Sequence, residues 1–364
     1  MKISRKIIGK ISIILIFINF ISMYVVSGKS IINPNKIINA SVLLYKGDDK
    51  YINKVKISLE NIQEKNKDRI NYKFYDGEEK QSVQNSQLKQ ILKEGTDLIL
   101  LNIVDIDSAE SVINKIKMNN IPVILFNREP VSLESIKSYG KSLFIGVDGA
   151  EIGRLQGKII NEAWKYKEIF DKNNDDVFQY IFIKGEKDNI ETQLRSNYVI
   201  KSLNDYGIKN LQIASQYCNW DKDCAKIVVK KFLLRYGNVI DGIICNNDEM
   251  AEGSIEALHE FGYNMGNFNN NSVIVVGIDG LEKALELIKN REMTGTVIQD
   301  PDKMTEALYL IGNNMVQSKP PLINTSYKFD SSGVTVRIPY SGYVVNDFDE
   351  VKFLRKSFYM INIK

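Results

Sequence analysis

The chain carries GTDLILLN at residues 95–102 and, after a segment with helical spacing of its apolar residues, IPVILFN at residues 121–127. A weaker version of this pair follows as IDGIICNN at residues 240–247 and VIVVGID at residues 273–279. Short apolar runs that alternate with helical segments are typical of βαβ units in a parallel sheet. Because the pair occurs twice, the sequence predicts an α/β protein with two similar parallel sheets flanked by helices.

The same alternation predicts ten strands between residues 40 and 298. They are expected at residues 40–45, 71–75, 97–101, 122–126, 142–147, 178–183, 210–215, 242–245, 272–277 and 295–298. Ten strands are more than a single sheet usually contains, and 364 residues are enough for two domains.

The composition is that of an ordinary globular protein, with 44% hydrophobic and 26% charged residues. The net charge of only +3 argues against an extensive nucleic-acid-binding surface. The chain has no P-loop, no G-x-S-x-G elbow, and no G-x-G-x-x-G motif after its first strand. These absences exclude the simplest nucleotide, hydrolase and dinucleotide functions, so we expect a protein that is not an enzyme.

Residues 1–28 have the pattern of an export signal, with four basic residues among the first ten and a mostly apolar run at residues 11–26. This run spans about 24 Å, less than the roughly 30 Å of a bilayer core, which favours a signal peptide over a permanent N-terminal anchor. The first cysteine is Cys218, so no lipidation cysteine follows the apolar run. In an exported protein, Cys218 and Cys224 could form a local disulfide around Trp220 or remain two free thiols.

Polar residues follow nearly every predicted strand, at the edge where open α/β sheets bind ligands. They are Asp49, Asn102, Asn127, Asp148, Glu186, Asn247 with Asp248, Asp279, and Gln299 with Asp300. Each one could also be an ordinary helix N-cap or turn residue. Together with Arg195 and the aromatic Tyr51 and Trp220, the set suits a ligand with many hydroxyl groups, such as a sugar.

Residues 171–179, DKNNDDVFQ, place side-chain oxygens at relative positions 1, 3, 5 and 9, as in an EF-hand calcium loop. Position 6 is Asp176 instead of glycine, and position 12 is Phe182 instead of glutamate. A calcium site would therefore need a carboxylate from elsewhere, and Asp241 is the candidate. The alternative is an Asx-rich turn without a metal.

Several segments in matching order resemble the galactose/glucose-binding family of bacterial periplasmic binding proteins, type I, over residues 39–351. The resemblance is carried by YKGDDKY at 45–51, QSVQNSQ at 81–87, LNIVD at 101–105, FNREP at 126–130, KGE at 184–186, CNND at 245–248, VGID at 276–279, GTVIQD at 295–300 and VRIPY at 336–340. It implies two Rossmann-like lobes joined by a three-strand hinge that closes around a sugar. We expect residues 38–140 and 299–337 in the N-terminal lobe, and residues 141–298 and 338–364 in the C-terminal lobe.

The resemblance also implies which residues bind the sugar. Contacts of the family's own type fall on Asp49, Asn102, Arg195, Asn247 and Asp279, and the stacking tryptophan falls on Trp220. Tyr51 stands where the family usually has phenylalanine and retains a stacking ring. Asn189, Glu191 and Gln299 replace an expected His, Asp and Asn, and the two longer side chains move their polar ends by about 1.5 Å. The expected ligand is D-galactose or D-glucose.

The family's calcium site falls on the loop described above. The implied ligands are Asp171, Asn173, Asp175, the carbonyl of Val177, Gln179, and Asp241, which stands where the family has glutamate. The shorter carboxylate of Asp241 and the backbone strain at Asp176 are both expected to weaken calcium binding.

The expected function is a monomeric receptor that delivers a monosaccharide to the membrane subunits of an ABC importer. One alternative is a sugar sensor that acts in chemotaxis through a chemoreceptor, or through a membrane histidine kinase. A sugar-responsive repressor would need a DNA-binding helix-turn-helix at the N-terminus, where this chain has its apolar segment instead.

Overall fold

The structure is a computed structural model that describes residues 36–266, 271–340 and 342–345. Its helices and strands all belong to one unit that begins at Ile38. The predicted export signal at residues 1–28 lies outside the described residues. Within the described residues, no helix combines the length and the apolar character needed to span a bilayer.

The first sheet has the strand order β11-β5-β4-β3-β1-β2, and all its neighbouring strands are parallel. Its strands are β1 (Ile38–Leu44), β2 (Ile70–Asp76), β3 (Leu98–Leu101), β4 (Val123–Phe126), β5 (Ser142–Gly146) and β11 (Thr335–Arg337). In the central register, Val42 of β1 lies between Phe74 of β2 and Leu100 of β3. We call this sheet and its helices the first lobe.

The second sheet has the order β12-β10-β9-β8-β6-β7, with β12 antiparallel to β10 and the other pairs parallel. Its strands are β6 (Phe178–Lys184), β7 (Asn210–Tyr217), β8 (Gly242–Cys245), β9 (Ile274–Asp279), β10 (Gly295–Ile298) and β12 (Tyr343–Val345). We call this sheet and its helices the second lobe. The predicted α/β class with two parallel-sheet lobes is therefore confirmed.

All ten predicted strands are present, and the structure adds β11 and β12, of three residues each. One predicted boundary is wrong, because we placed residues from 141 onward in the second lobe. Strand β5 instead pairs with β4 and β11 in the first sheet, so the chain leaves the first lobe only after Gly146. The chain passes between the sheets three times, after β5, after β10 and between β11 and β12.

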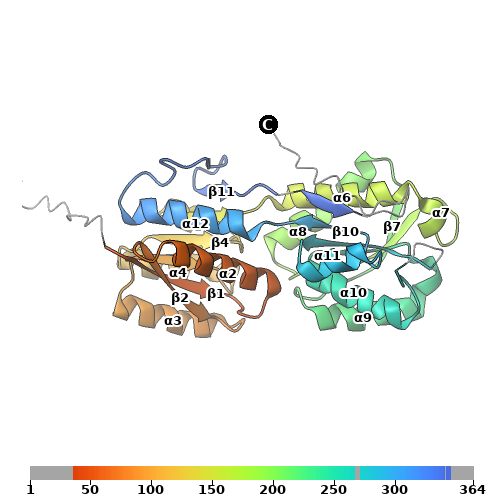
Figure 1. The fold of residues 1–364 in the computed structure, drawn as a ribbon, viewed down its shortest axis with the longest axis horizontal. Coiled ribbons are helices and arrows are strands. Elements are labelled where there is room, and N and C mark those ends of the chain that lie inside the picture. Colours follow the sequence, from red (N-terminus) through yellow and green to blue (C-terminus); the bar gives the residue numbers. More distant parts are fainter. Residues whose placement is uncertain (1–35, 267–270, 341, 346–364) are drawn as a thin grey trace, which may run out of the picture. The chain divides into compact units, whose positions relative to one another are not determined.

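Helices flank the sheets of both lobes (Figure 1). The first lobe has α2 (Lys50–Lys65), α3 (Gln81–Glu94), η1 (Ile106–Ser108), α4 (Ala109–Met118), α5 (Glu134–Lys137) and α12 (Pro301–Val316). The second lobe has α6 (Gly149–Trp164), α7 (Lys167–Phe170), α8 (Ile190–Asp205), α9 (Lys222–Tyr236), η2 (Gly237–Val239), α10 (Asp248–Glu260) and α11 (Glu282–Lys289).

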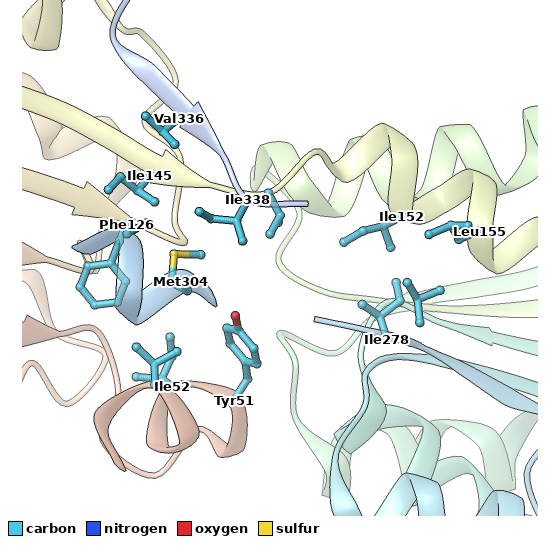
Figure 2. Close-up of a cluster of buried hydrophobic side chains, with 14 of the residues drawn as sticks. Tyr51, Ile52, Phe126, Ile145, Ile152, Leu155, Ile278, Met304, Val336 and Ile338 are labelled. Atoms are coloured by element: carbon cyan, nitrogen blue, oxygen red, sulfur yellow. The ribbon is translucent and has the colours of Figure 1, made fainter. Parts of the chain in front are cut away.

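Alternate residues along each strand enter different cores, because side chains of a strand point to opposite faces. Val42 and Leu100 belong to one buried cluster, whereas Leu43 and Leu101 belong to another on the opposite face of the first sheet. The cluster that contains Val42 also receives residues of the second lobe, such as Ile152 and Ile278 (Figure 2). Burial on both faces explains why the strands read as continuous apolar runs.

Candidate ligand-binding site

A cavity of about 420 Å³, which includes space open to solvent, lies at the carboxyl ends of the strands. Six lining residues come from the first lobe and six from the second: Tyr45, Asp49, Tyr51, Ile52, Asn127 and Arg128, then Asn189, Glu191, Arg195, Trp220, Asn247 and Asp279. Eight of the ten predicted sugar-binding residues are therefore brought together around one cavity.

Three of the lining residues also cap helices. Asp49, Asn189 and Asn247 precede α2, α8 and α10, and each side chain accepts a hydrogen bond from a backbone N–H in the first turn of its helix. The second polar atom of each side chain also has a protein partner, which is Tyr45 for Asp49, Glu186 for Asn189 and the carbonyl of Trp220 for Asn247. A carboxylate oxygen and an amide NH2 can each form a further hydrogen bond, so capping and ligand binding are compatible. Capping also fixes the orientation of these side chains at the cavity.

Arg195 is the central cation of the second-lobe wall and is only 3% exposed. Its Nη2 donates to Glu191 Oε2 at 2.5 Å and to Gln299 Oε1 at 3.3 Å, while Nη1 donates to the carbonyl of Asn246 at 2.8 Å. Burial lowers the pKa of Arg195, but nearby acids, chiefly Glu191, raise it above its ordinary value. Arg195 therefore remains a charged hydrogen-bond donor beside the cavity.

Asp279 ends β9 and contributes a carboxylate to the same wall. Burial raises the pKa of Asp279 well above its ordinary value, Arg195 opposes this effect, and the carboxylates of Asp248 and Asp49 add to it. Its φ of 123° lies in the region that side chains rarely adopt, so the backbone is strained there. A ligand hydroxyl that donates to Asp279 would compensate its loss of hydration.

The indole of Trp220 lines the cavity, and the Arg195 guanidinium lies 5.6 Å from the ring centroid. Gly185 makes room for this ring, because a Cβ atom at Gly185 would lie 2.3 Å from it. Cys218 and Cys224 form a disulfide, which closes the turn that holds Trp220. The structure thus selects the disulfide from the two alternatives that the sequence left open, while Cys245 is free and buried.

Two predicted contacts, Asn102 and Gln299, are absent from the cavity lining. Asn102 is fully buried, accepts a hydrogen bond from the Tyr45 N–H at 3.1 Å, and donates to Asn127 Oδ1 at 3.2 Å. It therefore positions two lining residues. Gln299 is buried and accepts a hydrogen bond from Arg195 Nη2 at 3.3 Å.

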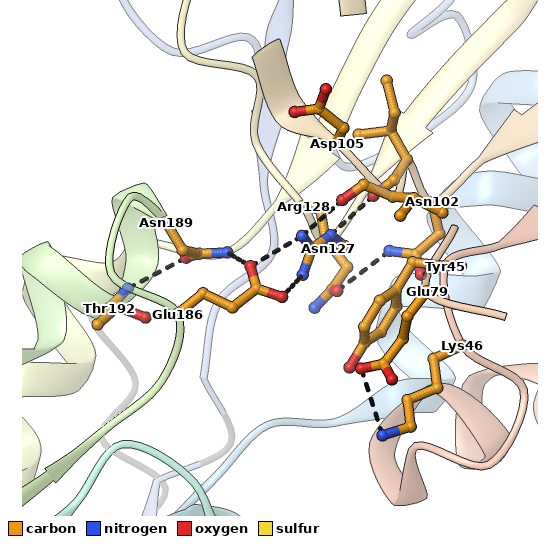
Figure 3. A network of polar contacts seen from close by, with 12 residues as sticks. Tyr45, Lys46, Glu79, Asn102, Asp105, Asn127, Arg128, Glu186, Asn189 and Thr192 are labelled. Carbon is orange, nitrogen blue, oxygen red and sulfur yellow. Dashed lines mark hydrogen bonds and ion pairs between the residues drawn. The ribbon is translucent and has the colours of Figure 1, made fainter. Parts of the chain in front are cut away.

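Sequence reasoning did not assign Tyr45, Ile52, Asn127 and Arg128 to the site. Asn127 stood among the polar strand ends, and Tyr45 and Arg128 lie in the quoted YKGDDKY and FNREP segments, so a signal was present. Figure 3 shows Arg128 beside Asn127 and reaching toward Glu186. The Arg128 guanidinium also lies 4.5 Å from the centroid of the Tyr45 ring.

The loop at residues 171–179 forms a turn stabilised by its own carboxylates. Asp171 accepts hydrogen bonds from the backbone N–H groups of Asp175 and Asp176, and Asp241 accepts from those of Lys172 and Gln179. Asp176 has a φ of 60°, the left-handed conformation expected at the sixth position of an EF-hand loop.

The loop backbone fits the predicted calcium turn, whereas its carboxylates face N–H donors. Across the described ranges, no group of three or more His, Cys, Asp or Glu side chains is arranged so that it could hold a metal ion. Burial raises the pKa of Asp241 to about 6, whereas the hydrogen bonds from the Lys172 and Gln179 N–H groups and the charge of Lys172 act in the opposite direction.

The two lobes, with a polar cavity lined from both, define a solute-binding protein. Residues 40–320 match the model of the periplasmic binding protein domain, so the chain belongs to the periplasmic binding protein family. The predicted resemblance is thereby confirmed. Because its relatives are solute-binding proteins, the prediction that the chain is not an enzyme is also confirmed.

Among known proteins, the D-galactose/methyl-galactoside binding periplasmic protein MglB of Haemophilus influenzae is 34% identical over 302 residues, which are 83% of this chain and 88% of that protein. A putative rhizopine-binding protein of Rhizobium meliloti is 28% identical over 72% of this chain and 79% of its own length.

Two solved structures share the fold. A solute-binding protein of Bacillus halodurans with bound myo-inositol has a TM-score of 0.69 at 21% identity and covers 86% of this chain and 96% of its own. One of Actinobacillus succinogenes with bound D-allose has a TM-score of 0.69 at 18% identity and covers 83% of this chain and 96% of its own.

Proposed function

We propose that this protein binds a monosaccharide, D-galactose or D-glucose, in the cavity between its lobes and delivers it to the membrane subunits of an ABC importer. The observation that carries the proposal is the shared lining, in which each lobe contributes six residues. A ligand that contacts both lobes favours the arrangement in which they are close together. Hinge closure would therefore be driven by the sugar.

The chemistry of the lining suits a neutral, hydroxyl-rich ligand. Asp49 and Asp279 provide acceptors, Asn127 and Asn247 provide both donors and acceptors, and Arg195 provides donors. Each lobe adds one aromatic ring, Tyr51 or Trp220, that can cover the apolar C–H surface of a sugar.

The choice of D-galactose or D-glucose is supported by the Haemophilus influenzae relative, whose name gives galactose. The other relatives and structures carry rhizopine, myo-inositol and D-allose in their names, and these differ in the pattern of polar groups around a ring. Asn189, Glu191 and Gln299 are the positions at which this chain departs from the galactose-binding pattern, so they are the residues expected to tune the choice.

The proposal is tested by calorimetric titration of the purified protein with D-galactose, D-glucose, D-allose, D-ribose and myo-inositol. We expect micromolar or tighter binding of D-galactose or D-glucose and weaker binding of the others. Tight binding of only one of the others would replace the proposed sugar. Failure of all five to bind would contradict the sugar-binding function itself.

A sensory function through a chemoreceptor or histidine kinase would use the same cavity. It would differ in partner and in location, since a retained N-terminal segment would hold an exported protein at the membrane. Membrane fractionation of the mature protein, with sequencing of its N-terminus, separates a cleaved and released monomeric receptor from an anchored sensor.

We also propose that the loop at residues 171–179, together with Asp241, binds calcium with low affinity. The left-handed backbone of Asp176 supports the predicted turn. The affinity is expected to be low because calcium would have to displace, or share the carboxylates with, the N–H groups that donate to Asp171 and Asp241. Calcium should raise the melting temperature of the protein, and Asp175→Asn should reduce this effect. An equal melting temperature with calcium and with chelator would show that the loop is a metal-free turn.

A further inference from the structure

Glu249 of the second lobe forms a hydrogen bond with the first lobe. Its Oε2 accepts from the backbone N–H of Lys50, the first residue of α2, at 3.3 Å, and Glu249 itself lies in the first turn of α10. A second contact of the same kind runs from Lys54 Nζ to the carbonyl of Gly280 at 3.4 Å. Glu249 does not line the cavity, so it contacts the opposite lobe without being one of the sugar-binding residues.

Carboxyl groups from both lobes lie close together at this contact. One comes from the first lobe and three come from the second: Asp49, then Asp248, Glu249 and Asp279. Burial and, after it, the charge of Asp49 raise the pKa of Glu249. Burial also raises the pKa of Asp279, and the charges of the other three carboxylates add to this effect. Bringing the lobes together therefore brings like charges together.

The first lobe also supplies groups that favour the charged form of Glu249. The N–H of Lys50 and the charges of Lys50 and Lys46 lower the pKa of Glu249. Lys50 is exposed, however, and Lys46 forms an ion pair with Glu79 at 3.3 Å. Burial and the charge of Asp49 outweigh these groups, and the pKa of Glu249 is about 7.

Both causes of the raised pKa depend on the position of the lobes. If the lobes move apart, the carboxyl group of Glu249 returns to water and Asp49 moves away with the first lobe. The pKa of Glu249 then returns toward its ordinary value of 4.5. Between pH 4.5 and 7, the arrangement with the lobes close together therefore binds more protons than the arrangement with the lobes apart.

We propose that closure of the lobes around the sugar takes up a proton at Glu249, so that this residue makes the sugar affinity depend on pH. The inference rests on the proposed sugar-binding function. Because protons bind more strongly to the closed arrangement, the affinity should fall as the pH rises from 5 toward 7 and should level off above that range. Glu249 thus controls the affinity without contacting the sugar.

Two variants of α10 test this inference. Glu249→Gln keeps a side-chain oxygen that can accept from the Lys50 N–H but removes the ionisable group. Glu252→Gln is the matched control, because Glu252 lies on the same helix and pairs with Lys222 within the second lobe. Calorimetric titration at pH 5, 6, 7 and 8 uses D-galactose or D-glucose, whichever the parent protein binds more tightly. At each pH, two buffers of different ionisation enthalpy give the number of protons taken up with the sugar.

The informative quantity is the dissociation constant of the parent protein divided by that of Glu249→Gln. This ratio should rise about fivefold or more between pH 5 and pH 8, after allowance for the partial exposure of Glu249 to water. At pH 6, the parent protein should take up more protons per bound sugar than Glu249→Gln. Glu252→Gln should match the parent protein in affinity and in proton uptake at every pH.

A constant ratio from pH 5 to pH 8, with equal proton uptake by the parent protein and Glu249→Gln, would overturn the inference and leave the sugar-binding function intact. The same change of ratio in Glu252→Gln would also overturn it, because the effect would then come from the overall charge of α10. Absence of sugar binding by the parent protein at every pH would contradict the proposed function itself and the inference with it.

Discussion

Arg128 of the first lobe and Glu186 of the second lobe form a two-bond ion pair, with Nη1–Oε1 at 3.0 Å and Nη2–Oε2 at 2.8 Å. Arg128 follows β4 and Glu186 follows β6, so the pair joins the carboxyl ends of strands from both sheets (Figure 3). Arg128 also donates to the carbonyl groups of Ile103 and Val104, which fixes its guanidinium plane. The pair therefore connects the lobes beside the cavity with a defined geometry.

Breaking this pair should weaken ligand binding. In Glu186→Ala, Arg128 keeps its backbone partners but loses its contact with the second lobe, so the arrangement that binds the sugar is less favoured. We expect the dissociation constant of the sugar to rise at least fivefold, about 1 kcal/mol. Glu151→Ala is the control, because Glu151 pairs with Arg154 within one helix. Equal affinities of the two variants would show that the lobe-bridging pair does not contribute.

Loss of a lining group from either lobe should weaken sugar binding. Trp220→Ala and Asp49→Ala should each raise the dissociation constant at least tenfold, about 1.4 kcal/mol. Because Asp49 also caps α2, Asp49→Asn is the informative companion, since its amide oxygen can still accept from Ile52 N–H. Titration calorimetry measures the affinities. Thermal unfolding shows whether a variant has also lost stability, so that a weaker affinity is not mistaken for partial unfolding. Parent-like affinity in both alanine variants would remove the cavity as the sugar site.

The stability of the protein should depend on pH through Glu249. Burial raises the pKa of Glu249 from 4.5 to about 7, and the carboxylate of Asp49 adds to the shift. Because the pKa is raised, the folded state binds more protons than the unfolded state between these two pH values. The free energy of unfolding is therefore highest, as far as Glu249 is concerned, below pH 4.5, and it falls as the pH rises toward 7.

Glu249→Gln removes this titration. Between pH 4.5 and 7, the free energy of unfolding of the parent protein should fall relative to that of Glu249→Gln by about 1–2 kcal/mol, after allowance for the partial exposure of Glu249 to water. Chemical denaturation across this pH range measures the difference. A constant difference would show that the Glu249 carboxyl group keeps its ordinary pKa.

The disulfide between Cys218 and Cys224 should contribute to both stability and affinity. It closes a short loop, for which the chain-entropy model gives about 2 kcal/mol of stabilisation. Replacement of both cysteines by serine should lower the free energy of unfolding by about this amount and weaken sugar binding, because Trp220 lies between them. A reducing agent should reproduce the effect in the parent protein and change nothing in the double variant. An unchanged affinity would mean that Gly185 and Arg195 alone hold the indole in place.

Local pattern was enough to predict the ten longer strands, because each is an apolar run bounded by polar residues. Strands β11 and β12 were missed for a physical reason, since three residues show no periodicity and these segments are extended only where β5 and β10 pair with them. The sequence of β5 did not indicate its lobe either, because its apolar residues resemble those of the strands in both sheets.

The alternation of strands and helices, the two-lobed class and the polar residues at the carboxyl ends of strands could all be predicted from the order of the amino acids. Which of these polar residues face the cavity depends on how the strands pack against one another. Asn102 and Asn127 follow adjacent parallel strands, yet Asn102 is enclosed by the backbone of Tyr45 and Phe126, while Asn127 lines the cavity. The direction of each side chain depends on backbone groups of neighbouring strands, which the chain brings together only when it folds.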